Sequence, residues 1–243
     1  RRLLVLLQNT YMTISVIIPA YNEEKYLSRT LDTVRAGERK PDEIIVVDGG
    51  STDSTPQVAK ANGAKVVTIP HRGIGFARQM GLEAARGDII AFTDADTLVP
   101  KNWLTKIEET LSRPGVVGVF GNFMVPDGRI PYRLYVNTIQ QVGNWLWWYI
   151  FRIPWAPGQN TAFLRATGIA AGGYPVDYKI AEDIEMARRL MKIGKLVYRS
   201  DLIVTSSGRR GNEGIGLLTR AVKVFFYYFL FRRADIIGFP DIR

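Results

Sequence analysis

Short apolar runs alternate with helix-like stretches along the first half of the chain. The runs that are typical of buried strands cover residues 14–19, 43–47, 65–69 and 88–93. The stretches with apolar side chains at helical spacing, or with helix start and stop signals, cover residues 27–34, 54–62, 75–86 and 102–111. This strand-then-helix order predicts an α/β fold with a mostly parallel sheet and helices on both of its faces.

The pattern changes after a further expected strand at 116–120, near Val125. From there we expect an irregular aromatic stretch, which contains Trp145, Trp147, Trp148 and Trp155. A helix is expected at 182–193 and a final strand at 196–199. We expect residues 1–12 to form an N-terminal extension and residues 13–243 to form one domain, with a change of role near residue 122.

Composition limits the possible chemistry. The 243 residues include no cysteine, which excludes disulfides and thiolate metal sites, and one histidine, His71, which excludes a histidine-rich site. The net charge of +9 favours a partner that carries negative charge: nucleic acid, an anionic membrane surface or a phosphorylated substrate. No apolar run reaches the roughly 18 residues that span a bilayer. We expect a cytoplasmic protein, either free or peripheral on the cytoplasmic face of the membrane.

Acidic and polar residues follow several of the predicted strands. They are Tyr21, Asn22, Glu23 and Glu24, then Asp48, Ser51 and Asp53, and then Asp94 and Asp96. Ligands of open α/β sheets bind beyond the carboxyl ends of the strands. Asp94 and Asp96 would repel each other there unless a cation lay between them, and oxygen ligands suit Mg²⁺ or Mn²⁺. The alternative is that both residues only cap the turn before the 102–111 helix.

Five ordered segments of the chain resemble the family 2 inverting glycosyltransferases, which have the GT-A fold. They are residues 15–24 (SVIIPAYNEE), 44–54 (IIVVDGGSTDS), 77–82 (ARQMGL), 89–96 (IIAFTDAD) and Glu182-Asp183. The resemblance covers about residues 13–205. It implies transfer of one sugar from a UDP- or GDP-linked donor, with residues 13–122 binding the nucleotide sugar and 123–243 forming the acceptor half.

The resemblance also assigns roles on the donor side. It implies that Pro19, Tyr21 and Glu23 line the nucleoside pocket, that Asp48 accepts a hydrogen bond from the base, and that Val47 and Ala95 contact the nucleoside. Asp96 would bind Mn²⁺ or Mg²⁺, and Asp94 would face the metal or the ribose. These residues and ions together make up the expected donor site.

Other expected site residues have plain structural alternatives. Arg78, and after it Arg72, are candidates for the donor diphosphate, or else solvated surface charges. The resemblance implies that Glu182 and Asp183 form the acidic acceptor-side pair, with Asp183 as the general base. Alternatively, both carboxylates only favour the positive end of a helix.

Loops on the acceptor side include 158–160 (GQN) and 172–174 (GGY). No Gln-x-x-Arg-Trp motif follows Asp183, which favours transfer of a single sugar over polymer synthesis. Some family members supply a metal-binding histidine where this chain has 205–210 (TSSGRR), so a serine or water could replace it there, and Arg209 or Arg210 could hold phosphate.

The aromatic stretch and a basic amphipathic helix expected at 218–229 would suit a membrane surface, or they would close the core of the acceptor half. The acceptor could then be a polyprenyl phosphate, or otherwise a glycan. A sugar-phosphate nucleotidyltransferase is the closest alternative, but the loop at 20–24 lacks its glycine-rich basic sequence. A nucleic-acid-binding module is not expected, because the basic residues are dispersed and the expected cleft is acidic.

Overall fold

The computed structural model describes residues 11–70, 73–178 and 180–209, and the site is built from these. The helix expected at 218–229 lies outside the described residues, as do His71, Arg72, Arg210 and most of the expected N-terminal extension. Within the described residues, no helix is long and apolar enough to cross a membrane.

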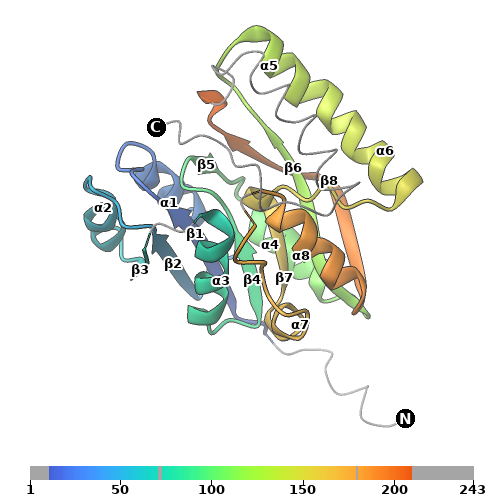
Figure 1. The fold of residues 1–243 in the computed structure, drawn as a ribbon, viewed down its shortest axis with the longest axis horizontal. Coiled ribbons are helices and arrows are strands. Elements are labelled where there is room, and N and C mark those ends of the chain that lie inside the picture. The colour runs from blue at the N-terminus through green and yellow to red at the C-terminus, as the bar shows by residue number, and fades with distance from the viewer. Residues whose placement is uncertain (1–10, 71–72, 179, 210–243) are drawn as a thin grey trace.

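A single eight-stranded sheet forms the centre of the described structure (Figure 1). In spatial order its strands are β3 (Lys65–Thr68), β2 (Glu43–Asp48), β1 (Ile14–Ala20), β4 (Ile89–Phe92), β7 (Thr161–Leu164), β6 (Val116–Met124), β8 (Lys195–Ser206) and β5 (Thr97–Leu98). The first four strands are parallel, and β7 pairs antiparallel with both β4 and β6. The carboxyl ends of β1, β2 and β4 therefore meet at one edge of the sheet.

Helices cover both faces of the sheet, as the strand-then-helix order predicts. They are α1 (Leu27–Arg35), α2 (Thr55–Ala61), α3 (Ile74–Ala84), α4 (Trp103–Leu111), α7 (Arg165–Ala170) and α8 (Glu182–Met191). Alternate residues of β1 separate the two cores. Ile14, Val16 and Ile18 pack with α1 and α4, whereas Ile17 packs with α3 and α8. The mixed, mostly parallel sheet of an α/β fold is thus confirmed.

The aromatic stretch is helical, which corrects the expectation of irregular structure. It forms α5 (Ile130–Leu134), a π-helical segment (Tyr135–Gln140) and α6 (Gln141–Phe151), which follow one another as a rod beside β6 and β8 (Figure 1). Apolar side chains lie on both the inner and the outer side of this rod. The sequence therefore lacks the polar stripe that reveals a surface helix.

The final strand is also longer than expected, because β8 continues through Arg199, Ser200 and Asp201 to Ser206. These polar residues resemble a strand end, but the backbone continues and pairs again with β6 after an irregularity between Phe120 and Asn122. Its far end pairs with β5, with Thr97 opposite Ser206. This places the residues after β8 beside the turn that holds Asp96.

Candidate functional site

The first part of the site lies where β1 and β2 end. Pro19 pairs with Val47 and Ala20 with Asp48, so residues expected to contact the nucleoside lie side by side. Asp48 is buried, and both of its carboxylate oxygens lie 3.3 Å from the backbone N–H of Ser51. This bond holds the turn after β2 against the end of the strand.

The loops after β1 and β2 are tied to each other by side chain to backbone hydrogen bonds. The Asn22 N–H donates to Ser51 Oγ at 2.8 Å, and Asn22 Oδ1 accepts from the Thr52 N–H at 2.9 Å. The Glu23 N–H donates to Thr55 Oγ1 at 2.7 Å. Asn22 has a left-handed backbone with φ of 55°, a conformation that asparagine tolerates better than most residues. These hydrogen bonds hold the two loops, residues 21–23 and 51–55, together at the ends of β1 and β2, and we call this arrangement the cradle.

Glu23 carries an unsatisfied atom in this cradle. Its side chain is buried, Oε1 pairs with Arg209, and Oε2 has no hydrogen-bond partner among the described residues. A buried carboxylate oxygen without a donor is costly, so such atoms commonly serve a ligand. Tyr21 lies nearby and is partly exposed.

Asp94 and Asp96 follow β4 in a short turn. Their side chains are 23% and 14% exposed, and buried Ala95 lies between them. The Ala95 carbonyl accepts a hydrogen bond from Thr30 Oγ1 of α1 at 2.8 Å, which fixes the turn from behind. Both carboxylates therefore remain accessible at the strand end while the backbone between them is held.

Arg209, just after β8, faces this turn. Its guanidinium lies 3.0 Å from Asp96 Oδ2, also pairs with Glu23, and packs over the Tyr26 ring at 5.0 Å. The carboxylates of Glu23 and Asp96 outweigh the effect of burial and hold the pKa of Arg209 above its usual value. A fixed positive charge thus lies at Asp96, in the segment where a metal-binding histidine was considered from the sequence.

The donor set at Asp94 and Asp96 fits a hard divalent cation. Within the described ranges, no group of three or more acidic or histidine side chains could enclose a metal ion. Mg²⁺ in phosphate-processing sites typically takes one or two carboxylates and completes its shell with water and substrate phosphates. Two partly exposed carboxylates, both paired with arginine, suit such an open site.

Arg78 of α3 joins this turn to the acidic pair of α8. It is buried, and its guanidinium pairs with Asp94 Oδ1 at 3.2 Å and with Glu182 Oε1. The surface-charge alternative for Arg78 is therefore wrong. The two carboxylates outweigh burial and hold the pKa of Arg78 above its usual value. Because one guanidinium contacts both, the acids after β4 and at the start of α8 belong to a single site.

Both carboxyl groups of the acidic pair at the start of α8 have raised pKa values. Burial, together with the neighbouring charge of Asp183, raises the pKa of Glu182 to about 7 despite Arg78. Burial also raises the pKa of Asp183 above its usual range, again against the pull of Arg78. Two adjacent carboxyl groups whose pKa values are both raised by burial are typical of acid-base sites.

Asp183 is oriented by backbone. Its Oδ2 accepts from the Gly158 N–H at 2.9 Å, and its Oδ1 accepts from the Ile184 N–H at 2.8 Å. A Cβ at Gly158 would collide with the Arg78 guanidinium, so only glycine permits this approach. The 158–160 loop thus contacts the acidic pair through Gly158. Asn160 has a structural role, because its side chain accepts from Trp103 Nε1 and donates to the carbonyls of Asn122 and Leu202.

The structure thus groups the expected residues around two connected places. The nucleoside candidates Pro19, Tyr21, Glu23, Val47 and Asp48 lie at the ends of β1 and β2. The other expected residues follow β4 or begin α8, and Arg78 of α3 joins these two groups. Sequence reasoning missed the pairing of Arg209 with Glu23. It placed Tyr174 in an acceptor-side loop but gave no role to its buried hydroxyl, which has no hydrogen-bond partner among the described residues. The TSSGRR segment indicated a basic group near Asp96, but no local signal pairs it with a glutamate after β1.

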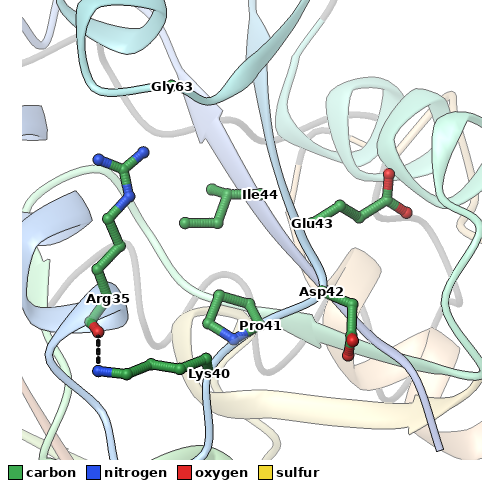
Figure 2. A pocket seen from close by; sticks show the side chains of 7 residues that line it. All are labelled: Arg35, Lys40, Pro41, Asp42, Glu43, Ile44 and Gly63. Carbon is green, nitrogen blue, oxygen red and sulfur yellow. Dashed lines mark hydrogen bonds between the residues drawn. The ribbon is translucent and has the colours of Figure 1, made fainter.

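A shallow pocket lies at the other edge of the sheet (Figure 2). It is lined by Arg35, Lys40, Pro41, Asp42, Glu43, Ile44 and Gly63. Glu43 begins β2, so this pocket is at the amino end of the strand that carries Asp48 at its carboxyl end. It has no contact with the acidic groups described above and does not belong to the candidate site.

Comparison with known proteins gives consistent results. An uncharacterized glycosyltransferase, alr2836, of Nostoc sp. is 37% identical over 123 residues, which is 48% of this chain and 38% of the relative. The glucosyl-3-phosphoglycerate synthase of Mycolicibacterium smegmatis is 41% identical over 102 residues, covering 36% of this chain and 32% of that protein. The chain thus spans less than half the length of these relatives.

A solved structure shows the same fold over almost the whole chain. The mannosyltransferase PcManGT from Pyrobaculum calidifontis, in complex with GDP-Man and Mn²⁺, has a TM-score of 0.69 at 23% identity and covers 93% of this chain and 66% of that one. The family described as glycosyl transferase family 2 matches residues 15–173, well over half of the sequence. The chain therefore belongs to glycosyl transferase family 2 and has the GT-A fold.

Proposed function

We propose that the chain transfers one sugar from a nucleotide diphosphate sugar to an acceptor, with inversion at the anomeric carbon. The observation that carries this proposal is the Arg78 bridge, which joins Asp94 on the donor side to Glu182 on the acceptor side. The mannosyltransferase with the same fold was solved with GDP-Man and Mn²⁺, which supports a donor of this class. Either UDP or GDP fits the proposal.

The donor nucleoside would lie in the cradle at the ends of β1 and β2. Asp48 would accept a hydrogen bond from the imide or amino group of the base, and Tyr21 would offer an aromatic face. Oε2 of Glu23, which has no partner among the described residues, would supply a second acceptor. Pro19, Val47 and Ala95 complete the pocket by packing and backbone contact.

Asp96, with Asp94 beside it, would hold Mn²⁺ or Mg²⁺ against the donor diphosphate. When bound, the ion stabilises negative charge on the departing nucleotide. Arg209 lies at the same carboxylate and would move its guanidinium from Asp96 to the diphosphate oxygens as the donor enters. Arg78, held by two carboxylates, would position the acids and balance charge.

Asp183 would act on the acceptor. The acceptor hydroxyl oxygen forms a bond to the anomeric carbon, the bond from that carbon to the diphosphate oxygen breaks, and the hydroxyl proton passes to Asp183. The two backbone N–H groups on Asp183 fix its orientation, and its raised pKa suits a proton acceptor near neutral pH. For a phosphate acceptor, which is already ionised, Asp183 would orient the acceptor and take no proton.

Calorimetric titration of UDP and GDP in the presence of Mn²⁺ tests the donor site directly. We expect one nucleotide to bind, and Asp96→Asn to lose most of this affinity. Asp32→Asn is the matched control, because Asp32 is an exposed carboxylate on α1 outside the site. If neither nucleotide binds the wild type, or if both variants bind equally well, the proposed donor site is wrong.

A further inference from the structure

The helical rod formed by α5, the π-helical segment and α6 has one side anchored to the sheet. Asn144 Nδ2 donates to Asn122 Oδ1 of β6 at 3.1 Å, and Trp148 packs edge-on against Phe120 with ring centroids 5.2 Å apart. Val136 is also buried on this side. These contacts hold the inner side of the rod against β6, so its outer side faces away from the sheet.

The outer side of the rod is apolar and exposed. Its large side chains are Leu134 (59% exposed), Tyr135 (43%), Ile139 (64%), Val142 (59%), Trp145 (48%), Leu146 (39%), Tyr149 (50%), Ile150 (61%) and Phe151 (58%). No charged residue occurs from 134 to 151. Single exposed apolar residues are ordinary, but a continuous row over several helical turns marks an interaction surface.

Arginines lie at both ends of this row. Arg129 and Arg133 are exposed at the start of the rod, and Arg152 is exposed at its end, where it reaches over the Trp148 ring at 5.8 Å. Tryptophan and tyrosine prefer the boundary between lipid and water, and basic residues beside them are attracted to anionic headgroups. The chain as a whole carries a net charge of +9.

We propose that the outer side of the α5–α6 rod docks on an anionic lipid bilayer, lying in its surface. The row is too interrupted by Asn, Gln and Gly to span a bilayer, and no described helix could do so. An apolar helical side flanked by cations instead suits the boundary between headgroups and acyl chains. Charge complementarity selects an anionic bilayer over a neutral protein partner.

Docking in this way would place the acceptor side of the site near the membrane. Only residues 152–157 separate the end of α6 from Gly158, whose N–H binds Asp183. A sugar acceptor anchored in the same bilayer would then reach Asp183 while its anchor stays in the bilayer. This consequence rests on the proposed function, whereas the docking itself does not.

Vesicle flotation without any sugar donor tests the docking separately from catalysis. We expect the wild type to float with phosphatidylcholine vesicles that contain phosphatidylglycerol, and much less with phosphatidylcholine alone. The double variant Ile139→Glu, Ile150→Glu should lose at least about tenfold in partitioning. The double variant Ile169→Glu, Ile193→Glu changes charge equally at exposed isoleucines elsewhere (53% and 44%), so it should lose much less.

Several results would overturn the proposal. One is a wild type that floats with neither vesicle, and another is an equal loss in both double variants. If Ile139→Glu, Ile150→Glu unfolds the protein, or turns a dimer into a monomer without vesicles, the surface is covered by protein and not by lipid.

A second measurement does not depend on glutamate substitutions. Because the chain has no cysteine, Ile150→Cys and Ile193→Cys each allow one environment-sensitive fluorophore to be attached. On adding anionic vesicles, the emission of the probe at 150 should shift to the blue and that of the probe at 193 should not. Equal behaviour of the two probes contradicts docking through this side.

Discussion

The proposed donor half (residues 13–122) and the described part of the proposed acceptor half (from residue 123) treat apolar residues in opposite ways. The residues of β1, β2 and β4 are almost all buried, those of the outermost strand β3 are exposed or half-buried, and α1 and α3 present their apolar sides to the sheet. In the acceptor half, α6 buries Trp148 but exposes Trp145, Tyr149 and Ile150. The comparison teaches that the first half holds a preformed cradle, whereas the second half leaves an apolar surface exposed, which we propose docks on lipid.

The largest expected effect is on the rate of the reaction, and it should leave donor binding unchanged. Asp183→Asn should lower kcat by about 10²- to 10⁴-fold for a hydroxyl acceptor, because general-base assistance is worth that much. Donor affinity should remain unchanged, since Asp183 contacts the 158–160 loop and not the nucleoside cradle. Steady-state kinetics combined with nucleotide titration checks both statements. Loss of donor affinity in this variant would contradict the division into halves.

The next effect concerns the connection between the halves. Arg78→Met removes the charge between Asp94 and Glu182 but keeps most of the apolar stem, and it leaves Glu182 buried without its partner. Breaking a buried pair in this way costs about 3–5 kcal/mol of unfolding free energy. Urea denaturation measures it.

Arg199→Met is the control, because the carboxylates that pair with Arg199, those of Asp201 and Glu109, are exposed (53% and 60%). Such pairs contribute about 0–1 kcal/mol. Equal losses of unfolding free energy in the two variants would show that Arg78 does not tie the halves together.

The same contrast explains how much of the fold the sequence could predict. The strands β1 to β4 and the helices α1 to α4 were expected within about two residues, because apolar strands and one-sided helices leave clear patterns. The strand β6 extends four residues beyond its expected end. The rod at 130–151 has apolar residues on both sides, so its pattern is lost. The short strands β5 and β7 and the helix α7 were not expected, since they are too short to show a period.

The candidate site shows the same limit. Residues at strand ends, such as Asp48 and Asp96, could be expected because strand order alone brings them to one edge. The bridge from Arg78 to Glu182 joins residues that are far apart in sequence, and nothing in the local pattern of α3 reveals it. Arg209 reaches Glu23 only because β8 runs past the polar residues at 199–201.

A third expected effect is a pH dependence that belongs to the acceptor half. Burial raises the pKa of Glu182 to about 7 and that of Asp183 above its usual range. Asp183 must lose its proton to act as a base, so kcat/KM for a hydroxyl acceptor should fall as the pH drops through the raised pKa of Asp183. The fall should approach about tenfold per pH unit. Nucleotide binding measured over the same pH range should lack this limb, and if it shows the same limb the titrating group lies in the donor half.

The smallest effect compares two glycines of the acceptor half. Gly158→Ala places a Cβ against the Arg78 guanidinium and should cost about 1–3 kcal/mol of unfolding free energy through overpacking. Gly143 lies within α6, and a Cβ there meets no atom of the described residues within 4 Å. Gly143→Ala should therefore stabilise the protein by about 0.5–1 kcal/mol, since alanine favours the helix.

Thermal and urea unfolding measure the change in unfolding free energy for each variant, and we expect this change to have opposite signs for Gly158→Ala and Gly143→Ala. Opposite signs would mean that the loop contacting Asp183 is tightly packed, whereas the rod has room on the side where Gly143 lies. Destabilisation by both would mean that further protein packs against α6 around Gly143. The rod would then be packed on this side, as the helices of the donor half are.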